Sequence, residues 1–464
     1  MVYQQKKGIM HSQKDHFDIL IIGSGPAGST IARKLAGKNK SIAVIDHEIG
    51  GTCALKGCIP KKVLANAAKI VHESNNLFEK RIITGKAKLN WQPLIQYKKT
   101  FTENVTADKI RHFTDLGITV FEEKARFIDE NKIKLENGPE LTGEKIVIST
   151  GAKPVDLPID GKNYLENYDA VLENEKIPKE VVFIGGGFIS FEFAHILARN
   201  GRKVTIFNDI NRPLPHFDPD IIKILVKASA KEGIDVYNNH KVTKIEKEKS
   251  KYFVHAELPD GQKKQVLCDI AIHGAGRIPD IENLNLEKAG VEYDKDGILV
   301  NMFLQSATNE KVYIAGDVAD TPYPFTFVAE YEANVVVKNI LKGRTEKVNY
   351  DGVPQILFTT PEAAGVGFSE EYLQEKNYDY AIKEGNNSSW DLPRTYNEMF
   401  AYYKIFIDKK TDRILGAHLL GAHASEVINV FALAIQHNLT RLDLMKSFLG
   451  FPTFIYDIKK MLAK

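Results

Sequence analysis

One nucleotide-binding pattern occurs twice in this chain, and it restricts the possible folds more than any other feature. Each copy consists of an apolar strand, a glycine-rich turn, a helical stretch and a second strand. The glycine-rich turns are at 23–28 and 185–190, and the second strands end at Asp46 and Asn208. In both copies the residue at this strand tip lies 23 positions after the first glycine. A single motif of this kind is weak evidence, but two in the same context predict two Rossmann-like domains.

The glycines of each copy have separate tasks. One permits the tight turn, one lets the backbone approach a pyrophosphate, and one lets the helix pack closely on the strand. The free N–H groups at the start of the helix then present a partial positive charge to the phosphates. We therefore predict a dinucleotide on each copy, bound in the first by Gly23, Gly25 and Gly28 and in the second by Gly185 and Gly187.

The two strand tips differ in a way that concerns the nucleotide. Asp46 can accept hydrogen bonds from both hydroxyls of an adenosine ribose. Asn208 carries no charge, so an anionic 2′-phosphate would not be repelled there. Asp209 follows directly, however, and the nearest cations are Arg202 and Arg212. The choice between NADPH and NADH on the second copy therefore stays open, with a slight preference for NADPH.

Two cysteines, Cys53 and Cys58, lie directly behind the first copy. The only other cysteine is Cys268, so the pair belongs to no disulfide framework, and four thiolates for a structural zinc site are lacking. Three cysteines in 464 residues are typical of a reducing compartment, where a close pair is more often catalytic or redox-sensing than structural. Its place behind a nucleotide motif suggests that electrons pass from a bound cofactor to sulfur.

The spacing of this pair requires an irregular backbone. On a regular helix, residues five apart are rotated by about 140°, so the two thiols would not face each other. A disulfide between them needs a distortion, which Gly57 and Pro60 permit. A helix N-terminus and the neighbouring lysines would favour the thiolate. These features indicate reactive cysteines rather than inert buried ones.

The charge balance excludes two classes of partner. Lys+Arg 62 against Asp+Glu 60 gives a net charge of +2, so no strong field attracts nucleic acid or a membrane surface. The longest apolar runs have the length of a strand and are too short to cross a bilayer. Residues 1–15 are polar, which predicts a flexible tail rather than a signal peptide. We expect a cytoplasmic protein whose partner is a small-molecule electron acceptor.

Taken together and in this order, these residues resemble the pyridine nucleotide–disulfide oxidoreductases. This flavoprotein family includes glutathione reductase, lipoamide dehydrogenase and mercuric reductase, and the resemblance runs from about Phe17 to the C-terminus. It implies an α/β fold with FAD on the first copy, NADPH or NADH on the second, and a C-terminal α+β domain that makes a homodimer. We divide the chain accordingly into a tail (1–15), an FAD-binding domain in two parts (16–150 and 276–345), an NAD(P)-binding domain (151–275) and an interface domain (346–464).

The resemblance also assigns catalytic roles. Cys58 would be the thiol against the flavin, and Cys53 the interchange thiol that meets the substrate. Lys61 and Glu192 match the lysine–glutamate pair beside the flavin N5, and Phe188 takes the place of the aromatic gate over the nicotinamide pocket. The other residues that the resemblance implies for cofactor binding are Gly51, Thr52, Thr150, Gly151, Ile189, Gly276, Arg277 and Asp317, together with the strand tips Asp46 and Asn208.

One departure from the family pattern concerns proton transfer. Near the C-terminus the family usually carries His-Pro-Thr followed by a glutamate three residues later, and this histidine of the partner chain is the acid/base for dithiol–disulfide exchange. Here Phe451 replaces the histidine and Tyr456 the glutamate. Loss of a positioned acid/base costs roughly 10²–10⁴-fold in rate, so rapid turnover of glutathione disulfide is not expected. Tyr456 or His423 are the candidates for a substitute acid.

The sequence thus predicts an enzyme that passes hydride from NAD(P)H through FAD to a Cys53–Cys58 disulfide, and then to a disulfide or another thiol-reactive acceptor. Because the histidine is absent, two alternatives stay open. One is a reductase of metal ions, quinones or oxidants, similar to mercuric reductase, and the other is a nicotinamide nucleotide transhydrogenase. A third reading is a binding or redox-sensing flavoprotein, but such a role would not require Lys61 and Glu192.

Overall fold

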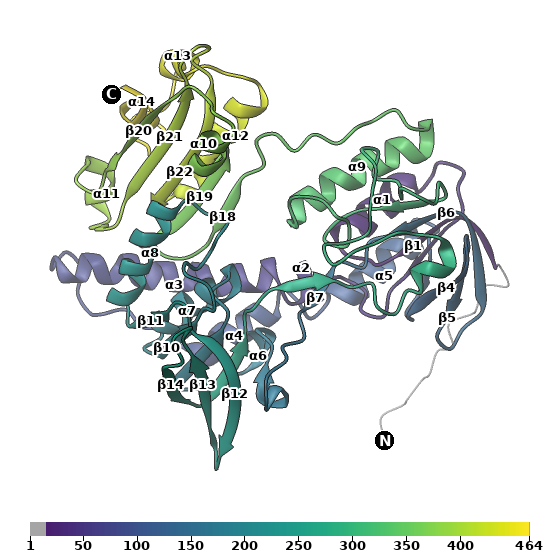
Figure 1. Cartoon of the computed structure of the whole chain (residues 1–464), viewed down its shortest axis with the longest axis horizontal. Helices are drawn as coiled ribbons and strands as arrows, with labels where there is room; N and C mark the ends of the chain where they lie inside the picture. Colours follow the sequence, from purple (N-terminus) through teal and green to yellow (C-terminus); the bar gives the residue numbers. More distant parts are fainter. Residues whose placement is uncertain (1–14, 464) are drawn as a thin grey trace. The chain divides into compact units, whose positions relative to one another are not determined.

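The computed structural model describes residues 15–463, so the predicted tail lies outside the described residues except for Asp15. The chain forms two compact units, each assembled from three separate segments. The first unit contains the residues up to Cys58, 101–153 and 277–349, and the second contains 59–100, 154–276 and 350 onward. Figure 1 shows both units and labels their helices and strands where there is room.

A largely parallel sheet is the centre of the first unit. Its strands run in the order β3-β2-β1-β6-β5-β4, and β17 pairs with β6 in parallel. The bounds are β1 His16–Ile22, α1 Pro26–Leu35, β2 Ile42–Ile45, α2 Thr52–Leu55, α5 Val105–Asp115, β3 Thr119–Phe121, β4 Ala125–Asp129, β5 Lys132–Leu135, β6 Glu140–Ile148, β16 Arg277–Pro279, the 3-10 helix Leu286–Ala289, β17 Val312–Ile314 and α9 Thr326–Lys342. Helices α1 and α9 pack together against this sheet (Figure 1).

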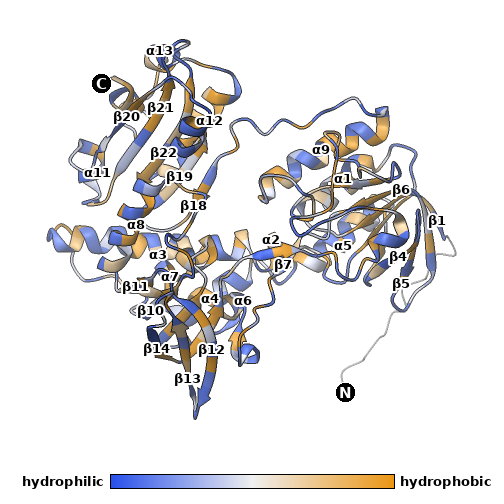
Figure 2. Cartoon of the chain, in the orientation of Figure 1, coloured by the Kyte–Doolittle hydropathy of each residue, from blue (hydrophilic) through white to orange (hydrophobic). Residues whose placement is uncertain are grey.

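The hydrophobic pattern explains why these strands pair in parallel. All four residues of β2 are buried, as expected of a strand covered on both faces. In Figure 2 hydrophobic residues run along the strands of this sheet, while hydrophilic residues follow the exposed connections. At the end of β1 the chain turns at Gly23 with φ +102, and a Cβ there would lie 2.3 Å from the carbonyl oxygen of Ser149. Only glycine fits this turn, which brings α1 onto the sheet.

The second unit contains another parallel sheet, in the order β11-β10-β9-β15-β8, with a three-stranded antiparallel sheet packed against it. The bounds are α3 Cys58–Glu79, α4 Trp91–Lys99, β7 Ala152–Pro154, the 3-10 helix Lys162–Tyr164, β8 Leu165–Glu166, α6 Asp169–Glu173, β9 Glu180–Ile184, α7 Phe188–Arg199, β10 Lys203–Phe207, α8 Pro219–Lys231, β11 Ile234–Tyr237, β12 Lys241–Glu248, β13 Lys251–Glu257, β14 Lys263–Cys268 and β15 Ile270–His273. Helix α3 begins at Cys58, the last residue of a first-unit segment, and β7 belongs to the first unit except for Pro154, which begins a second-unit segment.

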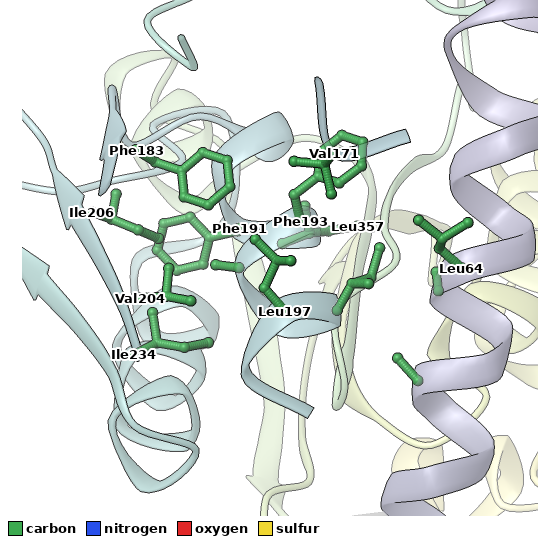
Figure 3. Close-up of a cluster of buried hydrophobic side chains, with 14 of the residues drawn as sticks. Leu64, Val171, Phe183, Phe191, Phe193, Leu197, Val204, Ile206, Ile234 and Leu357 are labelled. Carbon is green, nitrogen blue, oxygen red and sulfur yellow. The ribbon is translucent and has the colours of Figure 1, made fainter. Parts of the chain in front are cut away.

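One hydrophobic cluster joins several parts of the second unit. Phe183 of β9 and Phe191 of α7 belong to it and are fully buried (Figure 3). Leu64 of α3 and Leu357 of the C-terminal segment belong to the same cluster. The second nucleotide-binding fold, helix α3 and the start of the C-terminal domain therefore share one core.

The C-terminal segment forms an antiparallel sheet in the order β18-β19-β22-β21-β20, and helix α12 packs on it. The bounds are β18 Gln355–Leu357, β19 Glu362–Gly367, α10 Glu370–Glu375, β20 Tyr380–Asn386, α11 Asp391–Thr395, β21 Tyr402–Asp408, β22 Ile414–Gly421, α12 Ala424–Gln436, α13 Arg441–Lys446 and α14 Ile458–Ala463. The predicted α/β class with two Rossmann-like folds and a C-terminal α+β domain is confirmed. Within residues 15–463 no helix is long and apolar enough to span a bilayer.

Candidate active site

The glycine loop of the first copy leaves space for a ligand close to the backbone. A Cβ on Gly25 would meet no atom within 4 Å. The turn at Gly51 packs closely on this loop, since a Cβ there would lie 2.5 Å from the Cα of Gly25. Behind the loop, α1 begins with Pro26 and runs for ten residues. Two adjoining glycine turns at a helix N-terminus form a cradle that fits the pyrophosphate of a dinucleotide.

Asp46 lies at the tip of β2, where the sequence predicted it, and its carboxylate is fixed by the glycine loop. Its Oδ2 accepts hydrogen bonds from the backbone N–H and the hydroxyl of Ser24, both at 2.7 Å. Its Oδ1 accepts from the backbone N–H of Glu48 at 2.9 Å. A carboxylate offers about four acceptor positions, so Asp46 retains the capacity to accept from ribose hydroxyls.

Lys109 joins the two glycine turns, a role that the sequence analysis missed. From α5 its ammonium donates hydrogen bonds to the carbonyl oxygens of Ser24 at 3.2 Å and Gly50 at 3.1 Å. Burial lowers the pKa of Lys109, and the positive charge of Arg33 lowers it further. A lysine within an ordinary amphipathic helix carried no local signal of this contact. Its position places a half-buried positive charge next to the predicted phosphate site.

The structure brings the side chains of Cys53 and Cys58 into contact in the reduced, thiol form. Cys53 lies half-buried in the short helix α2, and Cys58 is the exposed first residue of α3. Between the two helices, a Cβ on Gly57 would lie 2.9 Å from the carbonyl oxygen of Thr52. This close turn supplies the irregular backbone that the spacing required. A hydrogen bond with Cys58, together with burial, raises the pKa of the Cys53 thiol.

Thr326 is a second residue that the sequence analysis missed. It is the first residue of α9, and its Oγ1 lies 3.3 Å from the Sγ of Cys58. A hydrogen bond from the same hydroxyl opposes the rise in the pKa of Cys53. One hydroxyl at a helix N-terminus therefore serves both sulfur atoms. The two positions are 268 residues apart, so no local pattern could connect them.

Two predicted cofactor residues, Arg277 and Asp317, form a pair in the first unit. The Arg277 guanidinium lies 3.2 Å from the Asp317 carboxylate and also donates to the carbonyl oxygen of Ala152. Burial raises the pKa of Asp317, and Arg277 opposes this rise. The neighbouring Thr150 donates its hydroxyl to the carbonyl oxygen of Asp280 at 2.8 Å. Of the other predicted residues, Gly28 lies on α1, Thr52 begins α2, Gly151 precedes β7 and Gly276 precedes β16.

Lys61 and Glu192 form the predicted ion pair within the second unit. Lys61 is the fourth residue of α3 and reaches the carboxylate of Glu192 on α7, which is 1% exposed. The other oxygen of Glu192 accepts the backbone N–H of Phe358 at 2.8 Å. The ammonium of Lys62 lies 3.7 Å from the centre of the Phe358 ring. The pair therefore joins α3, α7 and the start of the C-terminal domain.

The glycine loop of the second copy resembles that of the first, with one substitution. Gly185 and Gly187 lie between β9 and α7, and Phe188 and Ile189 begin the helix. Ser190 stands where the third glycine of the motif is expected, and its hydroxyl donates to the carbonyl oxygen of Gly185 at 2.6 Å. Phe188, the predicted aromatic gate, is 51% exposed. An exposed ring at this helix start is free to cover a bound nucleotide.

Aromatic residues replace the expected acid/base near the C-terminus. Phe451 is 74% exposed, and its ring meets that of Tyr456 edge to face with centroids 4.9 Å apart. His423 lies 3.3 Å from the hydroxyl of Tyr396 and packs on the ring of Phe454. Among the described residues, no group of three or more histidine, cysteine, aspartate and glutamate side chains is arranged to hold a metal ion.

Comparison with known proteins identifies relatives over nearly the whole chain. The family described as pyridine nucleotide-disulphide oxidoreductase matches residues 17–337, and its dimerisation domain matches 353–462. A mercuric reductase of Bacillus cereus is 31% identical over 96% of this chain and 70% of its own. A mitochondrial dihydrolipoyl dehydrogenase of Arabidopsis thaliana is 28% identical over 99% of this chain and 92% of its own. The Cu(II) complex of the HOCl-induced flavoprotein disulfide reductase RclA from Escherichia coli has a TM-score of 0.86 at 27% identity, covering 97% of this chain and 99% of that one.

Proposed function

The chain belongs to the pyridine nucleotide-disulphide oxidoreductase family, and from that premise we propose that Cys53 and Cys58 are its redox-active pair. The protein is an α/β flavoenzyme that uses FAD and NAD(P)H. Bound FAD would supply a two-electron carrier between the nicotinamide and the sulfur atoms. In the overall reaction, NAD(P)H and one proton reduce the Cys53–Cys58 disulfide to two thiols, and NAD(P)⁺ is released. The observation that carries this proposal is the contact between the two sulfur atoms beside the Thr326 hydroxyl.

The side chains of the cradle have separate tasks in this proposal. Asp46 would accept hydrogen bonds from the adenosine ribose, and the α1 N-terminus would hold the phosphates. Thr326 would orient the sulfur atoms, because its hydroxyl lies within hydrogen-bond distance of Cys58 and also hydrogen-bonds Cys53. The raised pKa of Cys53 keeps this residue a thiol at neutral pH, so it must give up its proton before it attacks an acceptor.

We expect Lys109→Met to weaken FAD binding about tenfold, because the variant leaves two carbonyl oxygens without their donor and removes a half-buried cation beside the phosphate site. Retention of FAD is measured by the fluorescence of the flavin released on dialysis. Arg111→Met is the matched control, since Arg111 lies on the same helix but is exposed and pairs with Asp108. Equal flavin affinity in the two variants would show that Lys109 has no part in the cradle.

The aromatic pair Phe451 and Tyr456 favours a soft metal ion as a second class of electron acceptor. A disulfide acceptor needs a proton donor for its leaving thiolate, whereas a thiophilic metal ion does not. Mercuric reductases are among the relatives, and the solved relative from Escherichia coli holds Cu(II). Steady-state turnover with glutathione disulfide, lipoamide, mercuric ion and a quinone separates the classes. We propose the soft metal ion as the alternative to a disulfide.

Phe451→His together with Tyr456→Glu is expected to raise the turnover of glutathione disulfide by about 10²-fold, the lower range for a positioned acid/base. The gain should follow a bell-shaped pH profile that the wild-type enzyme lacks. Phe448→His is the control, since Phe448 is a fully exposed neighbour. If the double variant reduces glutathione disulfide no faster than this control, the acceptor site is built for a different chemistry.

The dimerisation domain supports a homodimer, which we propose as the working form. Phe451, Leu433 and Leu442 are exposed apolar side chains of this domain, and a second copy would cover them. Light scattering of the purified protein tests this proposal, and a mass near 52.1 kDa would contradict it. Location in the cytoplasm stays a prediction from cysteine usage, and cell fractionation tests it.

A further inference from the structure

We infer that the hydride donor of this enzyme is NADH and that Asp209 discriminates against NADPH. This inference rests on the proposed function, because it concerns the nucleotide of the second copy. In a fold of this kind the end of the second strand meets the adenosine ribose, so the groups around Asn208 decide whether a 2′-phosphate is accepted.

The Asn208 side chain has no donor left for a phosphate. It is 2% exposed, and its Nδ2 donates to the carbonyl oxygen of Ile210 at 2.7 Å and to Oδ1 of Asn238 at 2.9 Å. A primary amide has only two donor hydrogens, and both are used. The remaining Oδ1 is an acceptor that faces the glycine loop, since a Cβ on Gly186 would lie 2.6 Å from it. An acceptor here suits a ribose hydroxyl and not an anionic phosphate.

The next residue adds a negative charge at the strand tip. Asp209 is exposed and directly follows Asn208. A 2′-phosphate carries a charge of about −1.5 to −2 at neutral pH, and at separations of several ångströms its repulsion by a partly solvated carboxylate corresponds to roughly tenfold or more in affinity. A ribose hydroxyl, in contrast, can donate to the same carboxylate.

The two arginines closest in the sequence do not offset this charge. The guanidinium of Arg212 donates to the carbonyl oxygens of Phe217 at 2.8 Å and Pro215 at 3.1 Å, so it is folded onto its own loop. Arg202 precedes β10 and lies at the opposite end of this strand from Asn208, roughly 20 Å away at about 3.3 Å per residue. The slight preference for NADPH that the sequence suggested is therefore not supported by these contacts.

Two other basic side chains lie around an aromatic pair, Phe207 and Tyr237. The His240 ring stacks on Phe207 with centroids 6.0 Å apart, and the Lys264 ammonium lies 4.0 Å from the centre of the Tyr237 ring. Phe207 is the last residue of β10. The His240 ring and the Lys264 ammonium are therefore packed on these two aromatic rings.

The first test compares the two nucleotides on the flavoenzyme at low ionic strength. We expect kcat/KM with NADH to exceed that with NADPH at least about tenfold. Asp209→Asn should reduce this ratio, and Asp209→Arg should reverse it. Asp260→Asn, an exposed carboxylate in the hairpin between β13 and β14, is the matched control and should leave the ratio unchanged.

The second test needs no turnover. Calorimetry should show that the wild-type enzyme binds 2′,5′-ADP about tenfold more weakly than 5′-AMP, with a gap that narrows as salt is added. Equal or better use of NADPH by the wild-type enzyme would overturn the inference, and so would Asp209 variants with an unchanged ratio. If neither NADH nor NADPH delivers electrons to any acceptor, the proposed function fails, while the two adenosine ligands still decide the inference.

Discussion

Cys58→Ser is expected to reduce turnover of a thiol-reactive acceptor by roughly 10³-fold or more, because a single thiol cannot store two electrons as an intramolecular dithiol. Cys53 would remain as a thiol whose pKa is raised by burial, which makes it a poor nucleophile at neutral pH. Reduction of the bound flavin by the nicotinamide should persist, because that step does not use sulfur. The measurements are steady-state turnover and an anaerobic titration that follows long-wavelength absorbance.

The third cysteine provides the control for this prediction. Cys268 is fully buried, and burial raises the pKa of its thiol to about 12. Cys268→Ala removes one sulfur atom from the apolar cluster around Val254 and should leave turnover within about twofold, since the change creates only a small cavity. Wild-type turnover in Cys58→Ser, or a missing long-wavelength band in the wild-type enzyme, would mean that electrons leave the flavin without passing through this pair.

The sequence predicted the features that depend on a short local pattern, but not those that depend on contacts between residues far apart in the chain. The two glycine loops were predictable because a strand, a tight turn and a helix N-terminus require particular residues within a short stretch, as Gly23 and Asp46 illustrate. The roles of Thr326 and Lys109 were not predictable, because they depend on which side chains the sheet brings together across 268 and 85 residues. The predicted domain boundaries stay a prediction.

The slight preference for NADPH that the sequence suggested at Asn208 shows a second limit of prediction from sequence. From the sequence, a neutral residue at the strand tip reads as a site that tolerates a phosphate. In the structure its amide hydrogens are turned toward Ile210 and Asn238, so only an acceptor remains. Residue type gave the charge, but the hydrogen-bond partners decide which atom is available to a ligand.

Glu192→Gln is expected to lower the free energy of unfolding by about 3 kcal/mol, the lower range for breaking a buried ion pair. The carboxylate of Glu192 is 1% exposed and holds the ammonium of Lys61, whose side chain is 15% exposed. Glutamine still accepts the backbone N–H of Phe358, so the variant removes the charge and leaves this hydrogen bond in place. Denaturant unfolding of the flavoenzyme measures the loss, and rapid mixing with NADH measures flavin reduction, which should slow at least about tenfold if the pair lies beside the flavin.

The double variant Lys61→Met with Glu192→Gln separates structure from chemistry. Because it leaves no uncompensated charge, most of the lost stability should return. Flavin reduction should stay as slow as in the single variant, since the ammonium is then absent. Recovery of both stability and flavin reduction would assign a purely structural role to the pair, as the joint that fixes α3 to α7. Recovery of stability alone would instead place Lys61 and Glu192 among the groups that act on the bound cofactor.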